Sequence, residues 1–93
     1  MDEIPQHRVS PTWKKIECLS EPFVLYKSYG YAPFIKIKVE DERWEKTLLI
    51  SPRSLAQALQ KIVESNNGQF TGLKIRVKKE SSDQRAPYIV EEL

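Results

Sequence analysis

Two segments of the chain alternate strictly between apolar and basic side chains. They are residues 34–39, which read FIKIKV, and residues 73–78, which read LKIRVK. Successive side chains of a β-strand point to opposite faces of the sheet, so each segment would bury its apolar set and expose its basic set. The exposed residues are then Lys36, Lys38, Lys74, Arg76 and Lys78. If both strands belong to one sheet, that sheet has a positively charged face.

Three further segments have the composition of strands. Residues 13–19 read as an imperfectly alternating strand that Pro22 interrupts and that residues 23–26 resume after a bend or bulge. Residues 44–50 follow the strand at 34–39 after a turn at 41–43, which is the spacing of an antiparallel hairpin. Residues 88–90 form a short last strand, and polar or Gly/Pro-containing loops are expected at 28–33 and 80–86.

One amphipathic helix is predicted over residues 52–65. Ser51 is a suitable N-cap, and Pro52 fits the first helical position, where its missing N–H costs nothing. The apolar positions that follow share one helical face, and they are Leu55, Leu59, Ile62 and Val63. The run at 66–68, which reads NNG, ends the helix because Asn and Gly accept a left-handed backbone.

These elements predict a single, mainly β domain over residues 12–93, preceded by a flexible tail at 1–11. The order is β-β-β-α-β-β, with one helix between the third and fourth strands. This order resembles the OB-fold, a five-stranded Greek-key barrel with a helix that closes one end. An open five-stranded sheet with the helix packed on one face, or a related small β-barrel, fits the same order.

The chain from residue 48 onward has a second recognisable order of parts. A strand at 48–51 (LLIS) leads into a capped helix at Ser54-Leu55, a glycine-led basic strand at 72–75 (GLKI) and a tyrosine-containing last strand at 88–90 (YIV). In this order the chain resembles small single-stranded-DNA-binding proteins of the phage and archaeal type. The resemblance implies that the domain binds single-stranded nucleic acid.

Composition sets limits on the class of protein. The 93 residues carry a net charge of only +2, so the distribution of charge matters more than its sum. Cys18 is the single cysteine and cannot form an intramolecular disulfide, and we interpret it as a small buried hydrophobe. The chain has no apolar run of membrane length, so a cytoplasmic location without a membrane partner is expected.

The sequence offers no catalytic constellation. His7 is the single histidine, it falls in the expected tail, and we expect it to lie on the surface without a metal. Asp41 and Glu42 are adjacent carboxylates in a predicted turn, which rarely supplies the pocket that acid–base catalysis needs. The isolated glycines form no phosphate-binding loop. We therefore expect no enzyme activity, no catalytic residue and no cofactor.

Single-stranded nucleic acid binds to basic grooves that also carry exposed aromatic rings for base stacking. Phe34 shares the face of Lys36 and Lys38 by its position in the alternation, so it is the strongest aromatic candidate. Trp44, in the following hairpin strand, and Tyr29 and Tyr31, in the preceding loop, are further candidates. Tyr26 and Tyr88 are weaker ones, and we assign the remaining rings to the core, namely Trp13, Phe23 and Phe70. DNA is slightly preferred over RNA.

The same residues permit other interpretations. Solvent-facing sides of strands are often lysine-rich because the charges discourage edge-to-edge pairing. A protein–protein interaction module would use the same surfaces with a protein partner. A small subunit of a larger assembly or homo-oligomer would instead use Leu49 or Ile89 in a symmetric sheet interface. Only nucleic-acid binding should weaken steeply as the salt concentration rises.

Overall fold

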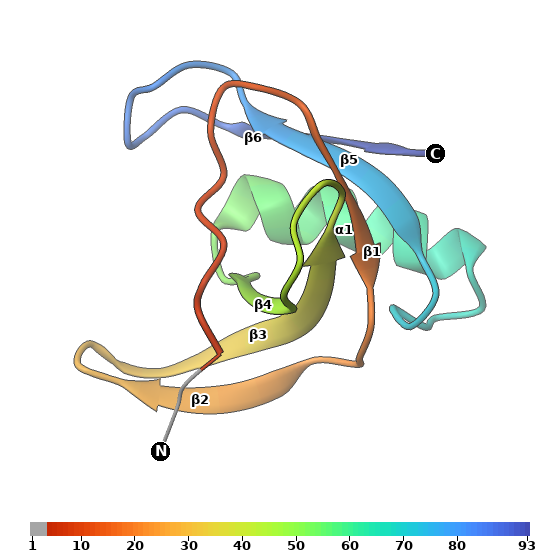
Figure 1. Ribbon diagram of the computed structural model, residues 1–93, viewed down its shortest axis with the longest axis horizontal. Helices are drawn as coiled ribbons and strands as arrows, with labels where there is room; N and C mark the ends of the chain where they lie inside the picture. The colour runs from red at the N-terminus through yellow and green to blue at the C-terminus, as the bar shows by residue number, and fades with distance from the viewer. Residues whose placement is uncertain (1–3) are drawn as a thin grey trace.

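The computed structural model describes residues 4–93 as one antiparallel sheet with a single helix (Figure 1). The sheet order is β2-β3-β1-β5-β6, and β4 pairs with the other edge of β3. The elements are β1 (Lys14–Cys18), β2 (Phe23–Lys27), β3 (Gly30–Val39), β4 (Lys46–Leu49), α1 (Arg53–Ser65), β5 (Lys74–Lys79) and β6 (Tyr88–Glu92). The mainly β class with one helix is therefore confirmed.

The strand count and the element order differ from the expectation. The sheet has six strands, and the order along the chain is β-β-β-β-α-β-β. The segment expected to be one bent strand is two strands. Leu19 N still donates to the Lys36 carbonyl, but the backbone ladder breaks between Leu19 and Phe23, where Pro22 has no N–H to donate. Both strands follow the same edge of β3, with Cys18 opposite Ile37 and Phe23 opposite Phe34.

The sheet is open and does not close into the expected five-stranded barrel. The open sheet with a helix on one face, which the sequence also allowed, is the better description. The apolar positions of both alternating segments are buried as predicted, and with the buried positions of α1 they make up most of the core. These residues are Ile35, Ile37, Val39, Leu73, Ile75, Val77, Leu55, Leu59 and Val63.

The helix ends where the sequence predicted but begins differently. Pro52 occupies the N-cap position, and no side chain caps the helix, so Ser51 does not play the expected role. The first helical hydrogen bond runs from Ala56 N to Pro52 O over 2.9 Å. At the other end Asn67 and Gly68 have φ angles of 58° and 76°, the left-handed values that end a helix.

The segment before β1 lies along the sheet (Figure 1). Thr47 N donates to the Pro5 carbonyl over 2.9 Å, and His7 N donates to the Thr47 carbonyl over 2.8 Å, at the outer edge of β4. Further along, Lys79 N donates to the Ser10 carbonyl over 2.9 Å. Residues 5–10, which we call the N-terminal strap, thus connect β4 to the end of β5 on the side where the sheet stays open.

Candidate functional site

The basic side chains lie on the face of the sheet that points away from α1, which we call the outer face. The strand β1 lies between β3 and β5. Its Glu17 is opposite Lys38 on one side and opposite Lys74 on the other, and its Lys15 is opposite Arg76. Opposed residues of antiparallel strands project to the same face. The two basic strands therefore share one continuous face, with β1 between them.

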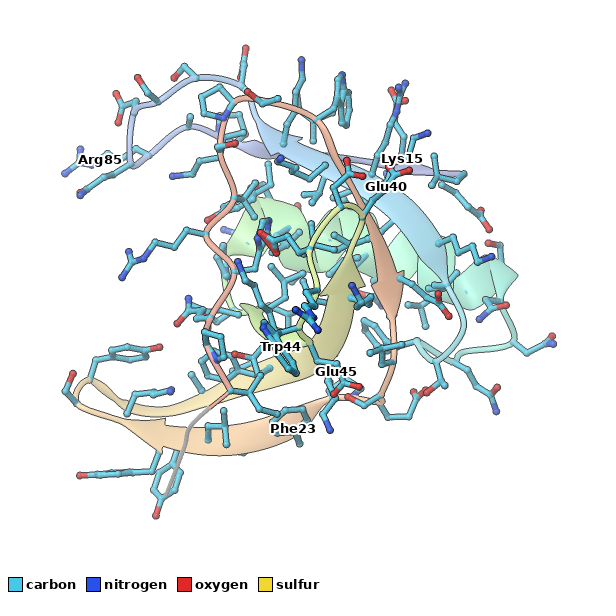
Figure 2. All side chains as sticks on the ribbon, in the orientation of Figure 1. Lys15, Phe23, Glu40, Trp44, Glu45 and Arg85 are labelled. Atoms are coloured by element: carbon cyan, nitrogen blue, oxygen red, sulfur yellow. The ribbon has the colours of Figure 1, made fainter. Side chains whose placement is uncertain are left out.

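A shallow hollow of about 320 Å³ lies over β1 in the outer face. Its basic lining comes from three different strands, as Lys15, Lys38 and Lys74. Carboxylates share the hollow, because Glu17, Glu40 and Asp41 also line it together with Ile16, Val39 and Leu93. Figure 2 shows Lys15 and Glu40 close together at one end of β1. The hollow therefore brings ammonium groups into reach of one anionic ligand without being uniformly positive.

Beside the hollow, Trp13 lies against two cations of β5. The guanidinium carbon of Arg76 is 4.3 Å, and the ammonium nitrogen of Lys78 is 4.8 Å, from the centre of the indole ring. Trp13 is half-buried, so its assignment to the core was wrong. Alternate residues of a strand share a face, so Trp13 points to the outer face with residues 15 and 17. This alternation is the sequence signal that could have predicted the position of Trp13. Trp13 is the aromatic ring that the sequence interpretation missed.

Two of the five predicted basic residues are paired with carboxylates. Arg76 Nε donates to Glu91 Oε1 over 2.8 Å, and a second guanidinium nitrogen reaches the same oxygen. Lys36 Nζ lies 3.7 Å from Glu45 Oε2. These ion pairs reduce the positive potential at both ends of the outer face. The three lysines that line the hollow are Lys15, Lys38 and Lys74, and three carboxylates line it with them.

Phe34 does not point into solvent with the lysines; it is 0% exposed. It does project to the outer face, but there Phe23 of β2 and Leu49 of β4 are its direct neighbours in register. The Lys27 ammonium also lies over its ring, 5.5 Å from the centre. The ring therefore belongs to a second, smaller apolar layer and has no free surface for a base.

Tyr26, Tyr29, Tyr31 and Trp44 are exposed, but none of them lines the hollow. Tyr31 is opposite Tyr26 and shares the face of Ile35, which is the face away from the lysines. Tyr29 is exposed in the turn between β2 and β3. Trp44 is exposed in the loop before β4, beside Arg43, and not in a strand. The structure therefore places the lysines together but scatters the aromatic candidates around them. Tyr88 is half-buried and lies against Lys79.

A small polar cluster lies beneath the N-terminal strap. His7, expected on the surface, is buried at 7% exposure because the strap pairs with β4. Glu42 accepts a hydrogen bond from Lys46 Nζ over 2.9 Å, which lowers the pKa of its carboxyl. Burial lowers the pKa of His7, so the imidazole is neutral at pH 7. Within residues 4–93, His7 Nε2, Glu42 Oε2 and Thr47 Oγ1 are buried without a hydrogen-bond partner.

Neither this cluster nor the outer face assembles the donors of a metal site. Among the residues that the structure describes, no three His, Cys, Asp or Glu side chains come together in a way that could hold a metal ion. In the same part of the chain no helix is long and apolar enough to cross a membrane.

Comparison of the chain with protein-family models, with curated proteins and with solved structures found no match in any of the three. The geometry of the outer face is therefore the basis for a functional proposal.

Proposed function

We propose that the outer face binds single-stranded nucleic acid and that the binding is non-catalytic. One observation carries the proposal: a hollow lined by lysines from three strands lies beside a tryptophan that two cations contact. Lysine ammonium groups bind phosphates without reading sequence. Trp13 is half-buried, and a base would stack on whatever part of its ring the two cations leave exposed. A basic path next to a stacking platform is the combination that single strands require.

The lysines and the tryptophan would contribute different terms to binding. Lys15, Lys38 and Lys74 would neutralise phosphates and release counterions, which gives a slope of about −0.7 per phosphate in log K against log salt for a single strand. Trp13 would add about 1–3 kcal/mol for a stacked base, largely independent of salt. Neither term discriminates strongly among bases, so we expect little sequence preference.

We also keep an OB-like relationship as a proposal. It is supported by the position of β1, which pairs with β3 on one edge and with β5 on the other, and by β6, which follows β5. In such a barrel the remaining gap would lie between β4 and β6, and here the N-terminal strap occupies the edge of β4.

Tryptophan fluorescence tests the proposal directly, because the chain has only two tryptophans. In a Trp44→Phe variant all indole emission comes from Trp13. We expect saturable quenching when an oligothymidine or an oligouridine of about 15 nucleotides is added at low salt, since a stacked base quenches the ring. In the reciprocal Trp13→Phe variant, Trp44 should respond much less.

Two results would count against the proposal. If fluorescence anisotropy of a labelled oligonucleotide shows no binding at low salt, where the ionic contribution is largest, the function is wrong. If binding occurs but Trp44 is quenched and Trp13 is not, the strand follows another path and the assigned site is wrong.

A further inference from the structure

The β2–β3 hairpin carries an unpaired strand edge that the nucleic-acid proposal does not use. Within the described residues β2 pairs with β3 and with no other strand. The other edge of β1 is paired with β5, and this pairing stops at Cys18, where Gly72 N donates to the Cys18 carbonyl over 2.8 Å. Beyond that point no strand of residues 4–93 lies beside the outward edge of β2. Figure 1 shows the hairpin projecting away from α1.

The other edges of the sheet are protected. The strap covers β4 through the bridge between Gln6 and Thr47, and β6 ends in Glu91 and Glu92, whose charges oppose the addition of another strand. The residues of β2 read FVLYK, with no proline and with its single charge at the end. An apolar edge without such charges or cover is a place where a further strand can pair.

The side chains beside this edge are apolar and exposed. Tyr26 and Tyr31 are 71% and 77% exposed, and their rings meet edge to face with centroids 5.0 Å apart. Val24 is on the same face and is also exposed. We call these three residues the tyrosine patch. It lies on the face opposite to the lysines, so an occupant of the patch does not compete with a ligand of the outer face.

We propose that the occupant is a second copy of this chain, paired antiparallel through β2 so that the two sheets become one. A two-fold axis at Leu25 would place Val24 opposite Tyr26 of the second copy. The existing register places Tyr31 beside Tyr26 and Pro33 beside Val24. A row of four apolar residues then crosses the interface. It runs from Tyr31 and Tyr26 of one copy to Val24 and Pro33 of the second copy. The edge is self-complementary, as a symmetric interface requires.

The interface of such a dimer is small. Pairing through the edges of β2 covers the strand edge and brings Tyr26 against Val24 of the second copy, while the outward faces of these side chains and of Tyr31 stay in water. The buried area therefore stays below the roughly 1,000 Å² at which specific interfaces begin. We therefore expect a dimer that depends on protein concentration, not a permanent one.

A cysteine at the proposed axis provides a sharp test. In an antiparallel pair the Leu25 Cα atoms would lie about 4.5–5.5 Å apart, within the range that a disulfide bridges. Cys18, the single native cysteine, is fully buried, so a Leu25→Cys variant has one accessible thiol. We expect this variant to form a disulfide-linked dimer on mild oxidation, and circular dichroism should verify its fold. In a matched Tyr29→Cys variant the two sulfurs would be roughly 26 Å apart, at 3.3 Å per residue, and should not link.

Sedimentation of the wild-type chain over a range of concentrations provides an independent measurement. We expect its mass to rise toward twice the monomer value, Tyr26→Lys to weaken this association at least tenfold, and Tyr29→Lys to leave it unchanged. A wild-type chain that stays monomeric, or equal crosslinking of both cysteine variants, overturns the proposal. It is also overturned if Tyr26→Lys reduces oligonucleotide binding but not sedimentation, because the patch is then a base-stacking surface. Oligonucleotide binding without dimers would leave the proposed function intact.

Discussion

The guanidinium of Arg76 lies 4.3 Å from the centre of the Trp13 ring and at the same time donates to the carboxylate of Glu91. The tryptophan and the carboxylate thus hold one cation between them, at the border of the hollow over β1. A phosphate that bound at this position would compete with Glu91 for the guanidinium. Glu91 therefore limits the affinity of the outer face for an anionic strand.

Removal of the Glu91 charge should strengthen nucleic-acid binding. In Glu91→Gln the guanidinium loses its ionic partner and becomes available to a phosphate, so we expect a twofold to tenfold rise in affinity for an oligothymidine at low salt. Glu92→Gln is the matched control, because it makes the same change in charge one residue further along β6. Equal gains in both variants would show that net charge is responsible and that the Arg76–Glu91 pair is not.

Phe34 should behave as a core residue. Truncation of a fully buried phenylalanine typically costs about 3–5 kcal/mol, so Phe34→Ala should lower the free energy of unfolding by that order. Tyr31→Ala, at an exposed position of the same strand, should change it by less than about 0.5 kcal/mol. Urea denaturation followed by circular dichroism measures both. A stable Phe34→Ala protein with weakened oligonucleotide binding would contradict the buried position.

Stability should fall as the pH is lowered from 6.5 toward 5, and His7 should be the cause. Burial lowers the pKa of the folded imidazole, partly opposed by Glu42 and reinforced by Lys46 and Lys14. Below the ordinary pKa of 6.5 the unfolded chain therefore binds more protons than the folded chain, so the free energy of unfolding decreases as the pH drops. The decrease ends once the pH passes the lowered folded pKa.

Between pH 6.5 and 5 the effect of His7 on stability can be distinguished from that of Glu21 and Glu42. The pKa values of these two carboxyls are lowered from 4.5, so their protonation falls mainly below this window. A His7→Gln variant should lose most of the stability change between pH 6.5 and 5. Urea midpoints at four or five pH values test this. An unaltered pH dependence in the variant would show that the imidazole is not buried in solution.

Glu21 should stabilise the turn before β5 through hydrogen bonds. Its carboxylate accepts hydrogen bonds from Phe70 N at 3.0 Å, from Thr71 N at 2.9 Å and from the Thr71 hydroxyl at 2.7 Å. The bonds from Thr71 and then from Phe70 lower the pKa of the carboxyl. Glu21→Gln keeps the size of the side chain but removes its charge, so the Thr71 amide should exchange with solvent several times faster. Unchanged exchange at Thr71 would show that these bonds do not persist in solution.

The alternation of FIKIKV and LKIRVK was sufficient to predict two strands and their buried sets, while their common basic face depended on both strands pairing with β1. Alternation reports which side chains share a face, but not what covers that face locally. Phe34 shows the limit: it projects with Lys36, yet Phe23 and Leu49 from the adjacent strands cover it. The pairing partners of β3 would have to be known before Phe34 could be assigned.

Two other differences arise from long-range contacts that a local pattern does not contain. Trp13 precedes β1, and only the register of β1 against β5 brings its ring to Arg76. His7 has a polar local sequence typical of a tail, but the backbone of Thr47 pairs with it and buries it. Pro22 indicated an interruption correctly, although the sequence did not reveal whether one bent strand or two would result.

The central claim is that lysines from three strands form one phosphate-binding surface over β1. The most direct test is the affinity for an oligothymidine, measured by fluorescence anisotropy from about 20 to 200 mM salt. The test protein is the double variant Lys38→Glu/Lys74→Glu. The control is Lys61→Glu, on the exposed side of α1. We predict that the double variant binds at least tenfold more weakly at low salt, with a slope of log K against log salt reduced by about 1.4, two phosphate contacts at 0.7 each. Lys61→Glu should keep the wild-type slope. Equal slopes in all three proteins would contradict the account.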